Sequence, residues 1–480
     1  MFQISMFRIK SKKQVLLIGV FTCLVAISAA YSASSYASTK QPNIIIILSD
    51  DGGYSDFGFS GNAFGKANFD TPNLDKLAKR GVTFSQGYVT ASVCSPSRAG
   101  MLTGRYQQRF GHEYNLPVTP EPGDVEKFNG MHVKEKTIAD HLKASDYRTG
   151  LIGKWHLGLA DQFHPNNRGF DEFYGLLGGG RSYWEIEGND TQYTNMRSNN
   201  KAVKHEGYLT DRLGEQAISF IERNKENPFF LYLSYTAVHA PMEAKPEHEK
   251  QLSHITDKNR RTLAAMTLAL DESVGQVLAA LDETGLTKNT LIIFLNDNGG
   301  PSDANYSINK PFSGVKGTLY EGGLRVPFTM SWPGKIKPGT SYDEVISSLD
   351  IVPTALAAAN AEQMGERALD GVDLLPFLND SNESKPHQTL FWRRAAFAAV
   401  RDGDHKLVRY PDRPAVLYNV AKDIGEHKNI AEDNPLLVRK LMKKLFAWEN
   451  ELQAPMFLTH SKWIKQNRQR YSIYTDVDKQ

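Results

Sequence analysis

The chain has 480 residues, of which 40% are hydrophobic and 23% are charged, so it can form one large hydrophobic core and a smaller one beside it. Its 56 Lys and Arg residues nearly balance 54 Asp and Glu residues, which leaves a formal net charge of +2. A charge this small gives no broad field for nucleic acid or an anionic membrane, so we expect neither as a partner. An anionic substrate has to be bound by a local group of residues.

The N-terminus has the layout of a secretory signal peptide. Four basic residues precede a mostly apolar run over residues 15–30, and small residues continue to Ala37. The apolar run is shorter than the about 20 residues that a bilayer-spanning helix needs, which argues against a membrane anchor. We therefore expect residues 1–37 to be removed, with cleavage after Ala37 or Ala30, and the mature protein to be periplasmic or secreted without membrane attachment.

From residue 42 onward, predicted strands alternate with predicted helices. In chain order, the strands cover residues 44–48, 148–152, 229–235 and 291–295. The amphipathic helices cover residues 74–80, 138–145, 209–224 and 262–284. This alternation predicts an α/β fold with a large, mostly parallel central sheet flanked by helices.

The sequence changes character after about residue 378. Two strand-like runs, 390–401 and 406–410, are separated by the turn at residues 402–404, and a helix is predicted over residues 435–452. We therefore expect a catalytic α/β domain over residues 38–378 and an α+β subdomain with a small antiparallel sheet over residues 379–480. For the tail after Pro455, two interpretations stay open: it folds back over the sheet or it is disordered.

Polar residues follow the carboxyl end of each strand in the α/β part. They are Asp50 and Asp51, Lys154 and His156, His239, and Asp297 and Asn298. Ligands bind beyond these strand ends in open α/β sheets, so the four segments point to one site. The three aspartates and the asparagine offer hard oxygen ligands that suit Ca²⁺ or Mg²⁺, although each of them alone is more typical of a turn or a helix cap.

Cys94 is the one cysteine that the mature chain is expected to keep, because Cys23 lies in the signal peptide. Such a chain cannot form an intramolecular disulfide, and a lone cysteine is usually a small buried hydrophobe. Its neighbours indicate more than that. Pro96 places Cys94 at a helix N-terminus, which favours an anion, and Arg98 lies one helical turn further on the same face.

The motif Cys94-Ser-Pro-Ser-Arg98, followed by Thr-Gly-Arg at 103–105, resembles the signature of the type I sulfatases, arylsulfatase-like members of the alkaline phosphatase superfamily. Further segments resemble blocks of that family in the family's order: 42–51, 153–156, 238–241, 296–299, 314–325 and 417–429. The resemblance implies the alkaline phosphatase/sulfatase fold and hydrolysis of sulfate esters. It also implies that Cys94 becomes formylglycine (3-oxoalanine), made by a formylglycine-generating or an anaerobic sulfatase-maturing enzyme.

The resemblance also implies a role for each site residue. One Ca²⁺ is held by Asp50, Asp51, Asp297 and Asn298 and shared with position 94 and the substrate sulfate. Hydrated formylglycine attacks sulfur with help from Arg98, and His239 with Lys316 protonates the leaving oxygen. His156 then takes a proton, so that sulfate leaves and the aldehyde is restored. Lys154 completes the set of cations that balance the charge of the sulfate.

A glycine-rich loop at 178–180 leads into Arg181, Tyr183 and Trp184, which could pair with a second sulfate and stack on a sugar ring. An equally weighted interpretation has the two aromatic residues packed beneath the loop. Arg105 and His112 are weaker candidates for substrate contact, because most residues of that segment are expected to be structural.

The predicted substrate is a sulfated polysaccharide or its oligosaccharides, such as the algal galactan carrageenan, or ulvan. Two alternatives stay open: a phosphonate monoester or phosphodiester hydrolase of the same superfamily, and a non-catalytic protein that binds sulfated glycans. The second is disfavoured because a binding protein needs no oxidisable cysteine.

Overall fold

The computed structural model describes residues 41–61, 68–116, 129–186, 191–379, 381–458 and 461–475. The predicted signal peptide lies outside the described residues. The described residues form one compact unit.

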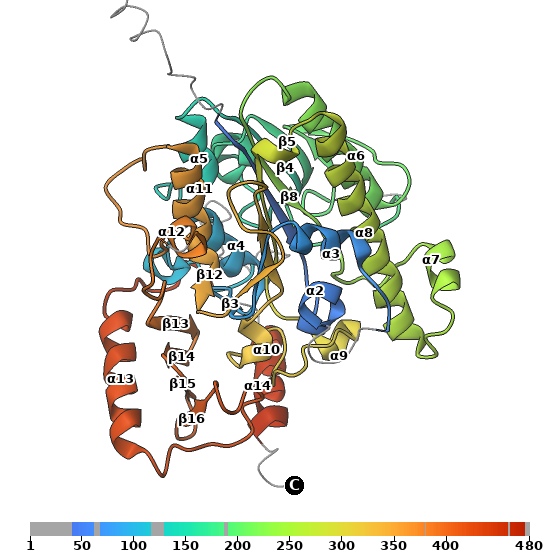
Figure 1. Cartoon of the computed structure of the whole chain (residues 1–480). Coiled ribbons are helices and arrows are strands. Elements are labelled where there is room, and N and C mark those ends of the chain that lie inside the picture. Colours follow the sequence, from blue (N-terminus) through green and yellow to red (C-terminus); the bar gives the residue numbers. More distant parts are fainter. Residues whose placement is uncertain are drawn as a thin grey trace, which may run out of the picture. The chain divides into compact units, whose positions relative to one another are not determined.

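The central sheet has ten strands in the order β11-β2-β10-β9-β1-β8-β4-β5-β6-β7. Three of its strands, β8, β4 and β5, are labelled in Figure 1. In that order the strands are Thr340–Tyr342, Val82–Phe84, Phe328–Ser331, Thr290–Asn296, Asn43–Ser49, Phe229–Ser234, Arg148–Lys154, Glu172–Leu176, Arg197–Ser198 and Lys201–Ala202. The five strands from β9 to β5 are parallel to their neighbours, whereas β10, β6 and β7 pair antiparallel. The predicted parallel sheet is therefore confirmed at its centre, and the edges make the whole sheet mixed.

Helices cover both faces of this sheet. The larger ones are α3 (Pro72–Lys79), α4 (Cys94–Thr103), α5 (Ile138–Lys143), α6 (Leu209–Asn224), α8 (Lys258–Glu283) and α11 (Ile351–Ala359). The four helices predicted by periodicity are all present, and α8 begins four residues earlier than expected because Asp257 caps it by accepting from the backbone N–H of Arg260. By length and composition α8 could span a membrane, but 78% of that segment is buried, as in a core helix.

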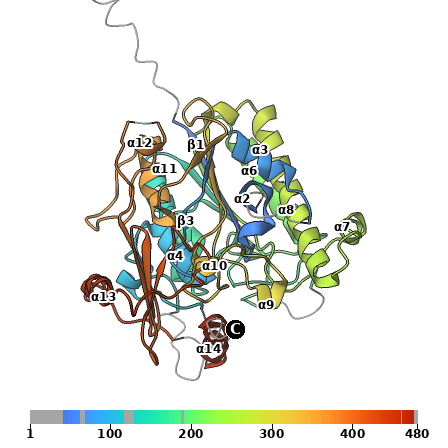
Figure 2. The ribbon, with the colours of Figure 1, turned by 60° about the horizontal axis from the view of Figure 1, so that its bottom comes forward.

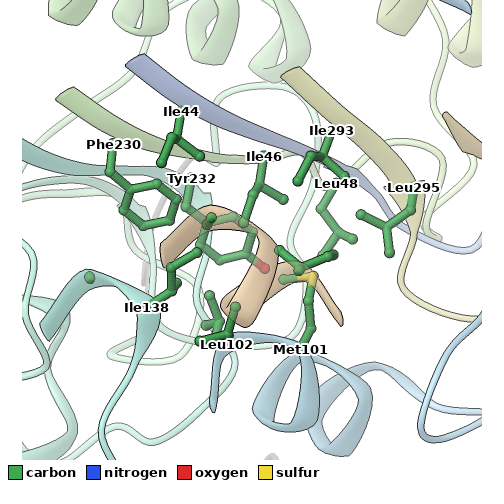
Figure 3. Close-up of a cluster of buried hydrophobic side chains, with 14 of the residues drawn as sticks. Ile44, Ile46, Leu48, Met101, Leu102, Ile138, Phe230, Tyr232, Ile293 and Leu295 are labelled. Atoms are coloured by element: carbon green, nitrogen blue, oxygen red, sulfur yellow. The ribbon is translucent and has the colours of Figure 1, made fainter. Parts of the chain in front are cut away.

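Strand β1 shows why this sheet forms. All seven of its residues are buried, as required of a parallel strand that is covered on both faces. Ile44, Ile46 and Leu48 pack with Met101 and Leu102 of α4 (Figure 3). The intervening isoleucines pack on the opposite face with residues of α3, α6 and α8. Burial of both faces fixes the strand, and with it the position of the two aspartates that follow.

A separate four-stranded antiparallel sheet is formed near the C-terminus by β13 (Thr389–Arg394), β14 (Phe397–Asp402), β15 (His405–Arg409) and β16 (Val416–Asn419). Helices α13 (Pro435–Glu449) and α14 (Ser461–Thr475) lie on opposite sides of it (Figure 2). The predicted single run over 390–401 was wrong, because the chain turns at Ala395, where φ is positive, and forms a hairpin. Strand β16 was not predicted.

Short elements connect these parts. They are α2 (Gly58–Gly61), β3 (Gly87–Tyr88), α7 (Pro246–Gln251), α9 (Ser302–Asn305), α10 (Glu321–Leu324), β12 (Ile346–Ser347) and α12 (Leu375–Leu378). Single turns of 3-10 helix are η1 (Tyr54–Asp56), η3 (Gln107–Phe110), η5 (Asp161–Phe163), η6 (Pro165–Asn167), η7 (Thr287–Asn289) and η8 (Ser348–Asp350). The tail helix α14 folds back onto the rest of the chain: Tyr471 is buried and stacks on Phe397 with ring centroids 4.2 Å apart.

Candidate active site

A cavity of about 420 Å³ lies at the carboxyl ends of the central strands. The residues that line it include Asp51, His156 and His239 after three of these strands, Cys94 at the start of α4, and Lys316 in the loop before α10. A volume of this size is typical of a small-molecule site. The four strand ends identified in the sequence therefore meet at one place.

Cys94 is the first residue of α4 and lies at the centre of this group. Its Sγ atom is 3.1 Å from Lys316 Nζ and 3.5 Å from Asp50 Oδ1. Burial, together with Asp297 and Asp50, raises the pKa of the Cys94 thiol far above its ordinary value. An unmodified thiol at this position stays protonated and is a weak nucleophile.

Three carboxylates surround the cysteine. Single ligand atoms of Asp50, Asp51, Asp297 and Cys94 all lie within 4.8 Å of one another. The side-chain oxygen of Asn298 is buried and has no hydrogen-bond partner among the residues that the structure describes, while its amide donates to Asp51 Oδ1 at 2.8 Å. Such a set of buried oxygen atoms fits a divalent cation, which would offset the mutual repulsion of the carboxylates.

Burial and neighbouring charges shift the pKa values of these carboxyl groups in opposite directions. Burial and the nearby Asp50 raise the pKa of Asp297 to about 6. Burial alone would also raise the pKa of Asp51, but Lys316 and His239 more than offset it and hold that pKa well below its usual range. The cluster is therefore only partly neutralised by the cations of the chain itself.

Arg98 and Lys154 lie behind the carboxylates rather than in the cavity lining. The Arg98 guanidinium donates to Asp297 Oδ2 at 2.8 Å and to Ser234 Oγ at 2.6 Å, and it lies 3.2 Å from Asp50. Lys154 forms an ion pair with Asp50. Both side chains are fully buried, so in this structure they hold the aspartates in place and do not reach into the cavity.

Two histidines approach the carboxylate cluster from the cavity side. His239 Nε2 is 3.6 Å from Asp51 Oδ2, and its side chain is 27% exposed. His156 is buried, and its Nδ1 has no hydrogen-bond partner within the described part of the chain. Burial lowers the pKa of His239 to about 4 and that of His156 well below its usual range, so both rings are neutral here.

Gly179 of the glycine-rich loop lies against the His156 ring, which explains why this position is a glycine. A Cβ atom on Gly179 would come within 2.7 Å of the His156 ring and 2.4 Å of the Tyr193 hydroxyl. The position therefore requires glycine so that the loop can close over the histidine. Arg181, which follows this loop, does line the cavity, and it donates to the carbonyl of Thr194 at 3.0 Å.

The other candidates for substrate contact lie away from the cavity. Tyr183 is buried, and its hydroxyl donates to the carbonyls of Thr236 and His239 at 2.8 and 2.9 Å, so it supports the His239 loop instead of meeting a sugar. Trp184 packs on Tyr208 with ring centroids 5.1 Å apart. Packing beneath the loop is therefore what the geometry supports for Tyr183, whereas Trp184 is 38% exposed and packs beside the cavity-lining loop without entering the cavity.

The structure places Arg105 and His112 in the framework of α4. Arg105 Nη1 forms an ion pair with Glu135 at 2.5 Å. His112 is buried, with Nε2 2.7 Å from the Ser95 hydroxyl, and burial lowers its pKa to about 3. Its contact with Ser95 fixes the helix turn that carries Cys94.

Several cavity residues were not identified from the sequence. They are Asn115, Tyr193, Arg394, Gln466, Asn467 and Arg470. Three of these belong to α14, and together with Trp463 they occupy the i, i+3, i+4 and i+7 positions of one helix face. This helical spacing could have predicted from the sequence that the four side chains lie on one face. Nothing local marks Arg394, whose neighbours in the cavity come from distant parts of the chain.

Comparison with known proteins identifies relatives over most of the chain. Residues 42–361 match the family model described as Sulfatase, and residues 315–447 match the C-terminal model of N-sulphoglucosamine sulphohydrolase. The N-acetylgalactosamine-6-sulfatase of Mus musculus is 32% identical over 411 residues, covering 80% of this chain and 75% of its own. The uncharacterized sulfatase YdeN of Escherichia coli K12 is 28% identical over 513 residues, covering 89% of this chain and 88% of its own.

Solved structures show the same similarity. The crystal structure of Ps i-CgsB has a TM-score of 0.82 and 35% identity, and the match covers 91% of this chain and 99% of that one. A second crystal structure of that protein, in complex with k-i-k-neocarrahexaose, matches equally well. The phosphonate monoester hydrolase of Agrobacterium radiobacter, at 19% identity and a TM-score of 0.61, shares the fold.

Proposed function

This chain belongs to the sulfatase family and hydrolyses sulfate esters, and from that premise we propose that its substrate is a sulfated galactan of the carrageenan type or an oligosaccharide derived from one. The observation that carries this proposal is the similarity to Ps i-CgsB, 35% identical over 91% of this chain, whose structure is known with k-i-k-neocarrahexaose. The cavity of about 420 Å³ is large enough for a sugar unit and its sulfate.

The proposed nucleophile is formylglycine at position 94. When hydrated, this aldehyde supplies a hydroxyl group at the start of α4, where the helix N-terminus favours the anionic sulfate. Support comes from the surroundings of the thiol, which lies among three carboxylates and stays protonated, so cysteine itself is poorly suited to attack. Lys316 lies 3.1 Å from Sγ and can stabilise negative charge that develops there.

The proposed metal is one Ca²⁺. Asp50, Asp51, Asp297 and Asn298 would hold it, and it would supply positive charge to the sulfate oxygens. In support, the atoms of these four side chains that can coordinate a metal are all oxygens. The Asn298 oxygen has no hydrogen-bond partner among the described residues. Arg98 and Lys154 hold Asp50 and Asp297 from behind, so the ligands are fixed before metal or substrate arrives.

Two histidines and a lysine move the protons in this proposal. His239, on the open side of the cavity, donates a proton to the sugar oxygen as the S–O bond breaks, and Lys316 assists by its positive charge. His156, buried and with an unpaired Nδ1 within the described chain, accepts the proton whose loss allows sulfate to leave. Without substrate both rings are neutral, which suits His156 as the base, and His239 has to gain its proton as the anionic sulfate ester binds, because a nearby negative charge favours the charged ring.

Export remains part of the proposal. The predicted signal peptide would deliver the chain to the periplasm or the medium, where a polysaccharide substrate is found, after a formylglycine-generating or anaerobic sulfatase-maturing enzyme has modified Cys94.

The test is sulfate release from a panel of carrageenans, ulvan, glycosaminoglycans and an aryl sulfate, after peptide mass spectrometry has confirmed that position 94 carries formylglycine. We expect release from carrageenan oligosaccharides with a kcat/KM at least about tenfold higher than for the other substrates, which corresponds to about 1.4 kcal/mol of transition-state binding. No release from fully converted protein, combined with turnover of a phosphonate monoester or a phosphodiester, would overturn the proposal.

A further inference from the structure

Arg394 lies at the end of β13 and lines the cavity from the side of the C-terminal sheet. Arg394 contacts the loop that carries Lys316, because its Nη1 donates to the carbonyl oxygen of Gly317 at 2.8 Å. Lys316, the preceding residue, is the one whose Nζ lies 3.1 Å from Cys94 Sγ. The guanidinium is therefore close to the reacting centre but belongs to a different sheet.

The surroundings of Arg394 differ from those of the cations beside it. Lys316 Nζ pairs with Asp51 at 2.6 Å, and Arg470 pairs with Asp303 at 2.9 Å. For Arg394, by contrast, the described residues provide a single hydrogen bond, to Gly317, and no carboxylate within ion-pair distance. Its Nε is buried and has no hydrogen-bond partner among the same residues.

Arg394 is only 8% exposed, so this lack of a counter-ion is costly. Transfer of a charged group from water into a protein interior needs a paired charge or a full set of hydrogen bonds. Burial lowers the pKa of Arg394 to about 10, with Arg470 acting in the same direction and Tyr471 against it. A guanidinium kept in this state beside an open cavity is suited to an anionic ligand, and its planar fork matches the oxygen atoms of a sulfate.

We propose that Arg394 binds a second sulfate ester of the same glycan, within the disaccharide whose first sulfate lies at Cys94. This assignment rests on the proposed function and makes the substrate more specific. The preferred disaccharide unit carries two sulfates: one is hydrolysed at position 94, and Arg394 binds the other. The neutral side chains of Gln466 and Asn467 line the same wall, so they can bind sugar hydroxyls beside this sulfate without competing for its charge.

The experiment uses two oligosaccharides that share the hydrolysed sulfate and differ only in the second sulfate of that disaccharide. Formylglycine-containing wild-type protein is compared with Arg394→Met and Arg393→Met, and kcat/KM is measured for both substrates. We expect the wild type to prefer the disulfated unit by roughly 10- to 100-fold, as for a hydrogen-bonded charge pair. Arg394→Met should reduce this ratio to about 1, through a higher KM on the disulfated substrate.

Arg393 is a matched control because it is adjacent on the same strand and pairs with Glu113, with Nε 3.1 Å from Oε2. Arg393→Met should keep the wild-type preference and lower the melting temperature, since it leaves a buried carboxylate unpaired. Arg394→Met should not lower the melting temperature of the free protein, because it removes an unpaired buried charge. A merely structural arginine would behave like Arg393.

The wild type alone already tests the idea, whether or not the variants fold. Equal kcat/KM on the two oligosaccharides would overturn the second-sulfate site while leaving the proposed function intact. An unchanged preference in Arg394→Met would overturn it as well. Failure of the proposed function is a different result, namely no sulfate release from either substrate.

Discussion

The two ends of the cavity are built on different principles. The inner end consists of Asp50, Asp51, Cys94, Asp297 and Lys316, all of which lie at or beside the rim of the large sheet. There, every charged side chain faces an opposite charge at hydrogen-bond distance, and Arg98 and Lys154 support the carboxylates from behind. An arrangement with so many mutual contacts tolerates little change.

The outer wall consists of Arg394, Trp463, Gln466, Asn467 and Arg470, which come from the C-terminal sheet and from α14. Its polar contacts are of another kind: Arg394 binds a backbone carbonyl, Arg470 pairs with Asp303 and donates to the Lys316 carbonyl, and Trp463 is 46% exposed. Under the proposed function, the sheet rim supplies the chemistry and the end of the chain supplies the surroundings of the leaving sugar.

The largest effect is expected at the inner end, from Cys94→Ala. Loss of the nucleophile should lower kcat by on the order of 10⁴- to 10⁶-fold on every sulfate ester, because no neighbouring residue can replace it. The rate of sulfate release measures this directly. Unconverted wild-type protein is the control, and its activity should rise in proportion to the formylglycine content found by peptide mass. Activity that does not depend on conversion would contradict the proposed nucleophile.

Removal of metal should be nearly as damaging. Excess chelator should lower turnover by roughly a thousandfold, since several kcal/mol of charge stabilisation are lost, and Ca²⁺ should restore it. Stability offers a second measurement: free Ca²⁺ at 100 times its Kd adds about 2.7 kcal/mol, which raises the melting temperature. In Asp297→Asn the rise with Ca²⁺ should be much smaller. Full turnover in chelator by protein that contains no metal would rule out the four-ligand site.

The inner end could be predicted because its signals are local. Strand β1 reads as an unbroken run of isoleucines because both of its faces are buried, and the residues that follow such a run lie at the sheet rim. Cys94 carried a recognisable motif. What the sequence could not supply is orientation: it predicted Arg98 and Lys154 as members of the site, but only the structure shows that both side chains pair with the aspartates.

The outer wall could not be predicted for a physical reason. Arg394 alternates with its neighbours as any strand residue does, and its partner Gly317 lies 77 positions earlier in the chain. Tyr183 and Trp184 are adjacent aromatic residues of the same loop, and the contacts that bury Tyr183, among them the hydrogen bonds of its hydroxyl, are made with residues far away in the sequence. The turn at Ala395 was missed because two apolar strands joined by two residues read as one run.

A smaller, substrate-dependent effect is expected from His239→Ala, at the boundary between the two regions. The kcat on a carrageenan oligosaccharide should fall by roughly a hundredfold, because a sugar alkoxide needs a proton to leave. On nitrophenyl sulfate the loss should be less than about tenfold, since nitrophenolate leaves without protonation. His427→Ala, at an exposed histidine of the C-terminal part, is the control. Equal losses on both substrates would remove His239 from the role of general acid.

The smallest effect concerns the ion pair that joins the segment before β13 to η8. His387, just before β13, has Nε2 2.7 Å from Oδ1 of Asp350, the last residue of η8. Burial alone would lower the pKa of His387, but Asp350 more than offsets this and raises it above its ordinary value of 6.5. The pair therefore stabilises the fold fully below about pH 6.5, and this contribution is lost as the pH rises through the raised pKa.

Replacement by His387→Gln should remove that pH dependence. Between pH 6 and pH 9, the melting temperature of the wild type should fall by about 2 °C more than that of the variant. Differential scanning calorimetry at fixed Ca²⁺ measures this difference. His427→Gln should follow the wild-type curve. If His387→Gln and wild type change in parallel over this range, the ion pair with Asp350 makes no measurable contribution to stability, and apolar packing around Trp392 and Tyr471 is the stronger link between the C-terminal sheet and the rest of the protein.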